Sequence, residues 1–458
     1  MLCRELNTSF VVGIFLVYGL SQGFAGSFFR VVSDFYWKDV QKMQPSAVQM
    51  YVGLYYIPWI MKPVWGFLTD TFPVRGYRRR PYFILAGFLG VSTALIISLQ
   101  GKLPVALALL CLVGMAAGVA IADVTIDACI ARNGIEQPKL APDMQSLCGF
   151  VSSVGALIGY SSSGVTVHLL GAQGGLGLMA IPPAFLVALG FVIFELRTNP
   201  HSEERKVMEK VRVVWEGMGR TIRSEKVWKP ALFMFLSISL SISTHEGHFY
   251  WYTDPKAGPA FSQEFVGMVY AIGAVASILG VLIYHKLLKG YPFRSLIFYA
   301  QVLYVVSGML DLIFILRWNL KLGIPDYFFV VMEECFNRVV SRIRWMPMIV
   351  LSARLCPLEI EGTFFALLMC IDSLGSLSSK TIGGLMLHLF HVTRTDFRNL
   401  WLVAFIRNLL RMITLVFVFL VPNSDQSDVV LPPELLKCHD SGDSESLKLV
   451  AMEGMDEA

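Results

Sequence analysis

Apolar stretches of roughly 18 to 25 residues recur along almost the whole of this sequence, and each is long enough to cross about 30 Å of hydrocarbon as a helix. This pattern constrains the fold more than any other feature. It predicts an all-α membrane protein with about twelve transmembrane helices. The approximate spans are 8–30, 47–69, 81–100, 104–131, 144–170, 175–196, 230–253, 264–286, 295–316, 326–355, 360–391 and 397–421.

Composition supports lipid as the surrounding solvent. Of 458 residues, 55% are hydrophobic and only 16% are charged, whereas a soluble chain carries about a quarter charged residues. A soluble core of this size would leave too little polar surface to face water. The net charge of +4 does not indicate nucleic acid, because the basic residues lie in short loops between spans, as membrane orientation requires.

The eight cysteines lie mostly within apolar runs and form no CxxC pair. We interpret them as small core residues, neither a disulfide framework nor a metal site. We expect no cofactor. Neither a cleavable signal peptide nor an Arg/Ser-rich transit peptide precedes the first span.

The chain is organised as six spans, a linker and six further spans. Residues 1–196 and 230–421 are the predicted bundles, joined by a charged cytoplasmic linker at 197–229. Residues 422–458 are acidic and contain little apolar surface, which predicts a disordered cytoplasmic tail.

Orientation follows from the basic residues of the loops. Those that are cytoplasmic when both termini are inside carry about twice as many Lys and Arg as the opposite loops, which predicts cytoplasmic termini. The sequence does not indicate which cellular membrane holds the protein.

The loop between the second and third spans places a glycine, an aspartate and three arginines at a distinctive spacing: Gly66, Asp70, Arg78, Arg79 and Arg80. It resembles the GxxxD…RxGRR loop of the major facilitator superfamily. That resemblance implies two pseudo-symmetric six-helix bundles and a gate latch, in which arginines bridge helix ends and release them as the halves rock. The alternative is a plain positive-inside anchor.

Further motifs across residues 10–422 resemble the folate–biopterin transporter family, in a plant-like member. Known members carry folates, pterins, other organic anions or S-adenosylmethionine, so the resemblance implies transport of such a solute. The motifs are Ile57-Pro58-Trp59, Lys62-Pro63, Asp123 to Asp127, Asp143-Met-Gln145, Met346-Pro347, Cys356-Pro357, Glu361-Gly362-Thr363, His391 to Arg394 and Asn399-Leu-Trp401.

Ionisable residues inside the spans are candidates for the site, because each costs about 2.5–3.5 kcal/mol to insert unless it has a partner or a function. Lys62 lies roughly 12 Å into the membrane, where it either meets an anionic substrate or snorkels to the inner interface. Asp123 and Asp127 share one helix face. We expect Asp127 to pair with the Arg78–Arg80 loop, and Asp123 to bind substrate or relay a proton.

The tenth span is the most charged. Glu334, Arg338 and Arg342 form one stripe at i, i+4 and i+8, with Arg338 near the midplane, where transporter sites converge. An arginine suits a substrate carboxylate; the alternative is an internal Glu334–Arg338 salt bridge that lets the helix insert. Asp372 on the eleventh span is our preferred proton-coupling residue, neutralising Arg338 when the site is empty.

Three other groups of residues are candidates for a functional or a structural role. Glu246, between His245 and His248, is a second candidate for proton coupling, and without a third ligand the histidines predict no metal site. Arg407 and Arg411 on the last span are expected to be structural, paired to the tenth or eleventh span. Tyr51, Tyr55 and Tyr56 either stack on a flat ring or form an interface belt.

The sequence therefore predicts a secondary active transporter of a folate- or pterin-like solute, working by alternating access. Its expected partners are that solute, the lipid bilayer and coupling protons, with no nucleic acid, and we expect a monomer. The alternatives are a transporter of another organic metabolite and a transporter-derived sensor. An enzyme is not predicted, because there is no HExxH, GxSxG or phosphate-binding glycine loop.

Overall fold

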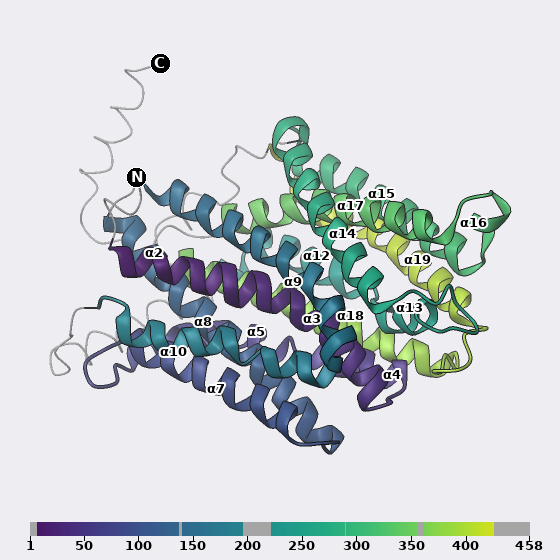
Figure 1. The fold of residues 1–458 in the computed structure, drawn as a ribbon. Helices are drawn as coiled ribbons and strands as arrows, with labels where there is room; N and C mark the ends of the chain where they lie inside the picture. The colour runs from purple at the N-terminus through teal and green to yellow at the C-terminus, as the bar shows by residue number, and fades with distance from the viewer. Residues whose placement is uncertain (1–6, 137–139, 196–220, 289, 356–360, 426–458) are drawn as a thin grey trace.

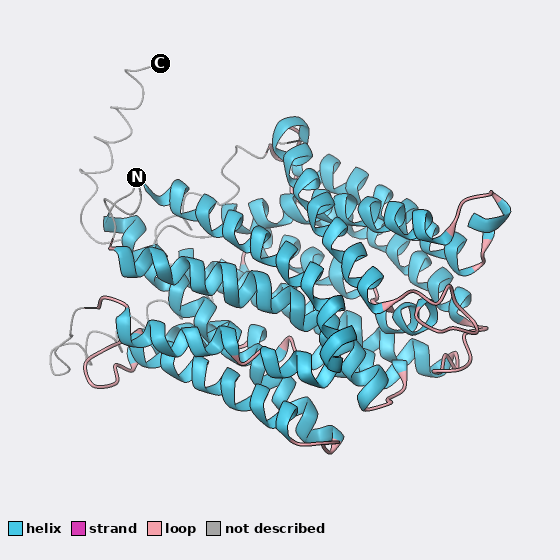
Figure 2. Ribbon diagram, in the orientation of Figure 1, coloured by secondary structure: helices cyan, strands magenta, loops and turns pink. Residues whose placement is uncertain are grey.

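The computed structural model describes residues 7–136, 140–195, 221–288, 290–355 and 361–425. Within these ranges the chain is helix and loop (Figure 2), apart from an isolated backbone pairing between Val74 and Tyr77. The predicted all-α membrane fold is confirmed. Residues 197–220 of the predicted linker (197–229) and residues 426–458 of the predicted tail (422–458) lie outside the described residues.

The first group of helices covers residues 8–192. It begins with one continuous helical run, whose α and π segments are α2 (Thr8–Ile14), η1 (Phe15–Ala25), α3 (Gly26–Phe35) and η2 (Tyr36–Val40). The other members are α4 (Pro45–Leu54), α5 (Ile57–Ile60), α6 (Lys62–Thr71), α7 (Arg80–Leu99), α8 (Val105–Glu136), α9 (Ala141–Leu178) and α10 (Ile181–Val192).

The second group covers residues 225–420. Its members are α12 (Glu225–Ser239), α13 (His245–Tyr252), α14 (Gln263–Ile283) with η5 (Tyr284–Leu288), α15 (Phe293–Ile315), α16 (Trp318–Lys321), α17 (Asp326–Arg354), α18 (Glu361–Leu389) and α19 (Leu400–Val416) with η6 (Phe417–Leu420).

Seven helical segments of the described residues are long and apolar enough to cross a membrane, so the count of about twelve stays a prediction. The helices α17 and α18 have 29 residues each, but their polar and charged side chains keep them outside this group. The segments are Thr8–Val40, Arg80–Leu99, Val105–Ile130, Ser146–Val192, Gln263–Leu288, Phe293–Ile315 and Leu400–Leu420.

Two predicted spans are interrupted. The span predicted at 47–69 is broken at 55–56 and at Met61, because Pro58 and Pro63 lack the N–H that an intact helix needs. The span predicted at 230–253 is broken at 240–244, between α12 and α13. Interrupted helices are typical of transporter sites, where unwound backbone lines a cavity.

The hydrophobic core shows how the two groups meet. The start of α2 lies at one end of the molecule and α13 and α16 lie at the other (Figure 1), and we call these the α2 end and the α13 end. At the α13 end, both groups share one core, with Trp37 and Leu176 packed in the same cluster as Phe249 and Leu400. Two further clusters each draw on one group alone.

Glycines allow helices of the two groups to approach closely. The helix α9 packs against α14, and α18 packs against α4. A Cβ atom on Gly267 of α14 would lie 2.9 Å from the carbonyl oxygen of Tyr160 and 3.0 Å from the backbone nitrogen of Gly164. The contact between α9 and α14 therefore has no room for a side chain at Gly267.

We predict that Gly267→Ala destabilises the protein by about 1–3 kcal/mol, because the new methyl group meets backbone that cannot move aside. Gly149→Ala is the matched control on α9, since a Cβ there meets nothing within 4 Å. Thermal unfolding of the purified protein in detergent measures both variants. Equal melting temperatures for the two would contradict the close contact.

Candidate functional site

Lys62, at the start of α6, forms an ion pair with Asp123 of α8. The side chains are 20% and 5% exposed. Gln22 of η1 donates a second hydrogen bond to Asp123, and the Lys62 Nζ atom lies 4.8 Å from the ring centroid of Trp59. Lys62 is thus a paired cation inside the first group, an arrangement that neither of its two sequence interpretations included.

Asp127 lies one turn further along α8 and accepts a hydrogen bond from Tyr18. The structure does not bring it to the arginine loop. There the Glu195 carboxylate accepts hydrogen bonds from the backbone amides of the arginines, at 2.6 Å from Arg78 and 3.1 Å from Arg80. Asp70 belongs to α6, but its side chain lies outside the described part of the chain.

Side-chain contacts of the arginine loop, and the position of Gly66, bear on the predicted latch. The Arg79 guanidinium donates to the Thr69 hydroxyl at 2.8 Å, and that of Arg80 donates to the Ile193 carbonyl at 2.8 Å. A Cβ atom on Gly66 would lie 3.7 Å from Val124 of α8, an ordinary contact distance. The loop is therefore fastened to α6 and to the chain after α10, and Gly66 faces α8.

The charged stripe of α17 is present as predicted from its spacing. Arg338 donates from Nε to Glu334 at 2.6 Å, and the two side chains are 26% and 21% exposed. Arg342 donates to the Ser277 hydroxyl of α14 at 2.5 Å and lies over the Trp345 ring. The internal salt bridge that we considered therefore exists, while Arg342 points to the neighbouring helix.

Asp372 is not the partner of Arg338. The charge that acts on the Asp372 carboxyl is that of Arg344, whose guanidinium donates to Ser241 at 2.8 Å and lies 4.2 Å from the ring centroid of Tyr304. Because Glu334 already neutralises Arg338, Asp372 has no such role in this conformation.

Tyr270 of α14 stands between the two groups of helices. The guanidinium carbon of Arg30, from α3, lies 5.8 Å from its ring centroid, and that of Arg338 lies 5.9 Å from it. The Tyr160 ring of α9 lies 5.7 Å away at 41°. Cations facing an aromatic ring from both sides of an interface can hold a flat, negatively charged molecule.

Two cations at this interface were missed by the sequence reasoning. Arg30 and Lys380 form no salt bridge within the described residues, although the charges of Arg30, Glu246 and Asp34 act on Lys380. Each stands in a predicted apolar span, at 8–30 and 360–391, so the insertion cost that singled out Lys62 would have found them too. Cations that form no direct ion pair in the described part of the chain are candidates to bind an anion.

A buried acidic and imidazole cluster lies beside these cations. His245 and Glu246 of α13 approach Asp34 of α3, with 3.1 Å between His245 Nε2 and Asp34 Oδ2. The Glu246 backbone N–H donates to Gln49 Oε1 of α4 at 2.9 Å. The predicted coupling residue Glu246 thus contacts the first group of helices, and the sequence reasoning missed its neighbour Asp34.

A cavity of about 250 Å³ opens beside this cluster. Its wall includes Arg30 and Tyr270 together with His245, Glu334 and Arg338. The cavity therefore brings together residues predicted from the sequence and residues that it did not reveal. The rest of the wall comes from the second group of helices and combines apolar and aromatic side chains with a polar network.

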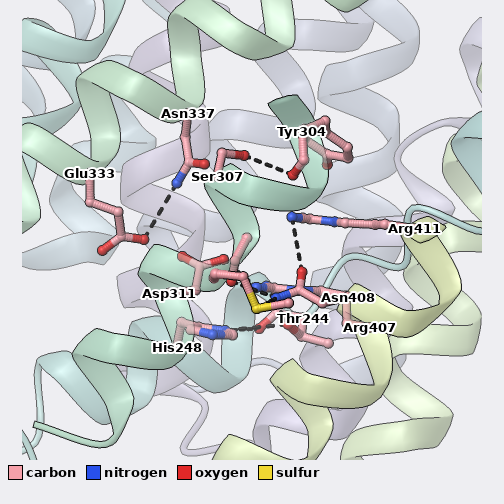
Figure 3. A network of polar contacts seen from close by, with 12 residues as sticks. Thr244, His248, Tyr304, Ser307, Asp311, Glu333, Asn337, Arg407, Asn408 and Arg411 are labelled. Atoms are coloured by element: carbon pink, nitrogen blue, oxygen red, sulfur yellow. Dashed lines mark hydrogen bonds and ion pairs between the residues drawn. The ribbon is translucent and has the colours of Figure 1, made fainter. Parts of the chain in front are cut away.

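That network is shown in Figure 3. Arg407 of α19 forms an ion pair with Asp311 of α15 and donates to the Thr244 hydroxyl at 3.1 Å. Arg411 donates to Asn408 at 3.4 Å, and Asn337 donates to Glu333 at 3.4 Å. We expected Arg407 to pair with the tenth or eleventh span; its partner is in the ninth, because α19 packs along α15.

The three tyrosines considered for stacking separate into two groups. Tyr55 accepts a hydrogen bond from Trp37 Nε1 at 2.7 Å, and Tyr51 packs on the Trp37 ring with centroids 5.2 Å apart. Both therefore belong to the shared core. Tyr56 instead lies near Arg30, Tyr160 and Asp372, whose charges act on its hydroxyl.

An interior in which charged side chains form ion pairs is typical of a membrane transporter. Comparison with known proteins leads to the same conclusion. Residues 22–432 match the model of a protein family described as the BT1 family. The chain belongs to the BT1 family. This confirms the predicted family, and the names of the relatives described next indicate a membrane transporter and not an enzyme.

Relatives of this BT1 family member carry matching names. It is 62% identical over 438 residues to a protein of Arabidopsis thaliana named "Probable folate-biopterin transporter 6", covering 95% of this chain and 87% of the relative. It is 32% identical to the "Folate-biopterin transporter" of Synechocystis, covering 86% of this chain and 78% of the relative.

Solved structures show the same fold at low sequence identity. The nucleoside transporter NupG superposes with a TM-score of 0.68 at 12% identity, covering 90% of this chain and 99% of that structure. A D-xylose–proton symporter superposes with a TM-score of 0.60 at 14% identity, covering 92% and 98%. The fold is thus that of major facilitator transporters.

We predict that Lys62→Ala and Asp123→Ala each destabilise this BT1 family member by about 3–5 kcal/mol, because each leaves a buried charge without its partner. The double variant should cost clearly less than the sum. Chemical denaturation of the purified protein measures all three, and strictly additive losses would show that the ion pair carries no coupling energy.

Proposed function

We propose that this protein is a secondary active transporter that moves a folate- or pterin-like anion across a membrane. Residues 1–196 and 230–421 would rock as two six-helix halves about the site, tethered by the linker at 197–229. The termini and the tail at 422–458 would face the cytoplasm, and one chain would suffice for transport. The names of the relatives in Arabidopsis thaliana and Synechocystis support this substrate class.

One observation carries the proposal: cations from both groups of helices surround Tyr270. Arg30 and Arg338 face its ring, and Lys380 stands beside Arg30. A folate joins a flat heteroaromatic ring to carboxylates, so it needs an aromatic surface and cationic groups in one place. Guanidinium groups bind carboxylates through paired hydrogen bonds.

The residues singled out in the sequence complete the proposed site. Lys62 with Asp123 would line the first half of the path, and Glu334 with Arg342 the second. Glu334 would release Arg338 when a substrate carboxylate replaces it. For coupling to protons, Asp372 and Glu246 remain the proposed residues.

We also propose that the loop between α6 and α7 acts as a gate latch. Asp70 and Arg78–Arg80 would hold the α2 end closed, with Gly66 permitting close packing and Asp127 meeting the arginines in that state. In the present structure Glu195 holds the loop backbone. A switch of Asp127 from Tyr18 to the arginines would then accompany closure.

We predict that Asp70→Asn and Asp127→Asn raise the labelling rate of a cysteine introduced at the α2 end. Loss of a coupling worth about 1–3 kcal/mol corresponds to a change of roughly 5- to 150-fold in the closed-to-open ratio. Asp396→Asn, in the loop at the α13 end, is the control. Labelling as slow as that of the control would leave the loop as a topology signal alone.

The proposed function is tested by uptake into proteoliposomes. The panel contains folic acid, a glutamate-free pterin, a nucleoside and a neutral sugar, each with and without an inward proton gradient. Accumulation of folate or pterin driven by the gradient supports the proposal. Uptake of the nucleoside or the sugar alone would assign the chain to another metabolite, and no uptake at all would favour a sensor.

Within that assay, we predict that Arg30→Ala, Lys380→Ala and Arg338→Ala each reduce folate uptake by at least about tenfold, the effect of losing one charged contact worth about 1.4 kcal/mol or more. Lys256→Ala, at an exposed loop position, is the matched control. Near wild-type uptake by all three variants would remove these cations from the site.

A further inference from the structure

Glu246 is the most deeply buried carboxyl group at the contact between the two groups of helices. It is 0% exposed, and neither carboxyl oxygen has a hydrogen-bond donor among the residues that the structure describes. A carboxylate in such a place requires a bound cation or a bound proton.

Its nearest acidic neighbour comes from the other group of helices. Ligand atoms of Asp34, His245 and Glu246 all lie within 4.8 Å of one another, and Asp34 is 2% exposed. Asp34 belongs to α3, whereas His245 and Glu246 begin α13. The two carboxyl groups therefore meet across the interface at the α13 end, where the core is shared.

Polar contacts around the pair join the same two groups. Gln49 of α4 accepts from the Glu246 backbone and donates to Ser243 at 3.2 Å. The Lys38 ammonium group donates to the Thr253 hydroxyl at 2.5 Å. The acidic pair is thus built into the contact that closes the α13 end.

We propose that Asp34 and Glu246 share one proton across this interface, and that the shared proton locks the α13 end closed. The inference rests on the proposed transport function and specifies its coupling site. With the proton in place, one carboxyl group donates a hydrogen bond to the other. Without it, two negative charges face each other in a dry site and push the halves apart.

The surrounding charges favour a proton over a metal ion. The groups that face the pair are Arg30 of α3, His245, Tyr250 and Tyr252 of α13, Tyr270 of α14, Lys380 of α18 and Tyr55, the residue that follows α4. Arg30 and Lys380 are cations and would repel a metal ion. They also stabilise the carboxylates once the proton has left.

The same two cations connect the lock to the substrate. Arg30 lines the cavity, and the charges of Arg30 and Lys380 both act on Glu246. A substrate anion that engages them withdraws positive charge from the acidic pair, so the pair binds its proton more tightly. By linkage, the proton strengthens substrate binding equally, and its loss on the other side of the membrane releases both.

The test measures closure of the α13 end without any substrate. Spin labels at Lys42 and Thr395, which are exposed positions on the two groups of helices, report the distance across this end. We expect the closed-to-open ratio of the wild-type protein to fall with rising pH over the range measured, by up to tenfold per pH unit for a single proton.

Glu246→Gln, which cannot ionise, should keep the α13 end closed over the whole range, and Asp34→Asn should do the same. Glu264→Gln is the matched control, because Glu264 also pairs across the interface, with His168 at 3.0 Å, but at an exposed position. It should keep the wild-type pH dependence. A pH-independent wild-type protein, or an unchanged pH dependence in both Glu246→Gln and Asp34→Asn, overturns the proposal.

Two further measurements separate the coupling site from the transport proposal. Raising the Na⁺ concentration at fixed pH should leave the distances unchanged; closure by Na⁺ would assign the pair to a metal cation and overturn the shared proton. The uptake panel can fail while the wild-type protein still closes in a pH-dependent way and the variants lose this dependence. That result would support the shared proton and contradict the proposed substrate class.

Discussion

The free-energy cost of charge in a low-dielectric interior governs this structure. An unpaired ion inside the bundle is expensive, so ionisable side chains of the helices meet one another: Lys62 with Asp123, Arg338 with Glu334 and Arg407 with Asp311. Each pair lies within one group of helices. Arg30, Lys380 and the Asp34–Glu246 pair are left at the contact between the groups, where charge can change during a transport cycle.

The apolar packing around those charges limits how the two groups of helices can separate. At the α13 end both groups contribute to one core, while separate clusters serve each group elsewhere. Because a packed core is bistable and not continuously deformable, the halves can separate at the α13 end only by exposing this shared surface. A small electrostatic change beside it can therefore decide between two arrangements.

Much of the fold could be predicted from the sequence, because hydrophobic length and loop charge are local signals. The breaks around Pro58 and at 240–244 were missed, because hydropathy measures apolar length and not the continuity of a helix. Asp34 was missed for another reason: the first span was predicted to end at residue 30, but the helical run continues to Val40. Pairings such as Lys62 with Asp123 depend on which helices lie side by side. The depth of a residue along its own helix does not determine this arrangement.

The ion pair between Arg407 and Asp311 bears on how the chain enters the membrane. Arg407 and Arg411 are 5% and 7% exposed in α19, and each would cost about 2.5–3.5 kcal/mol at the centre of an isolated inserting helix. Asp311 removes part of that cost, but it is carried by α15, which is synthesised earlier. The last helix therefore enters the bilayer at a lower free-energy cost when it can pack against α15, which is already present when α19 is made.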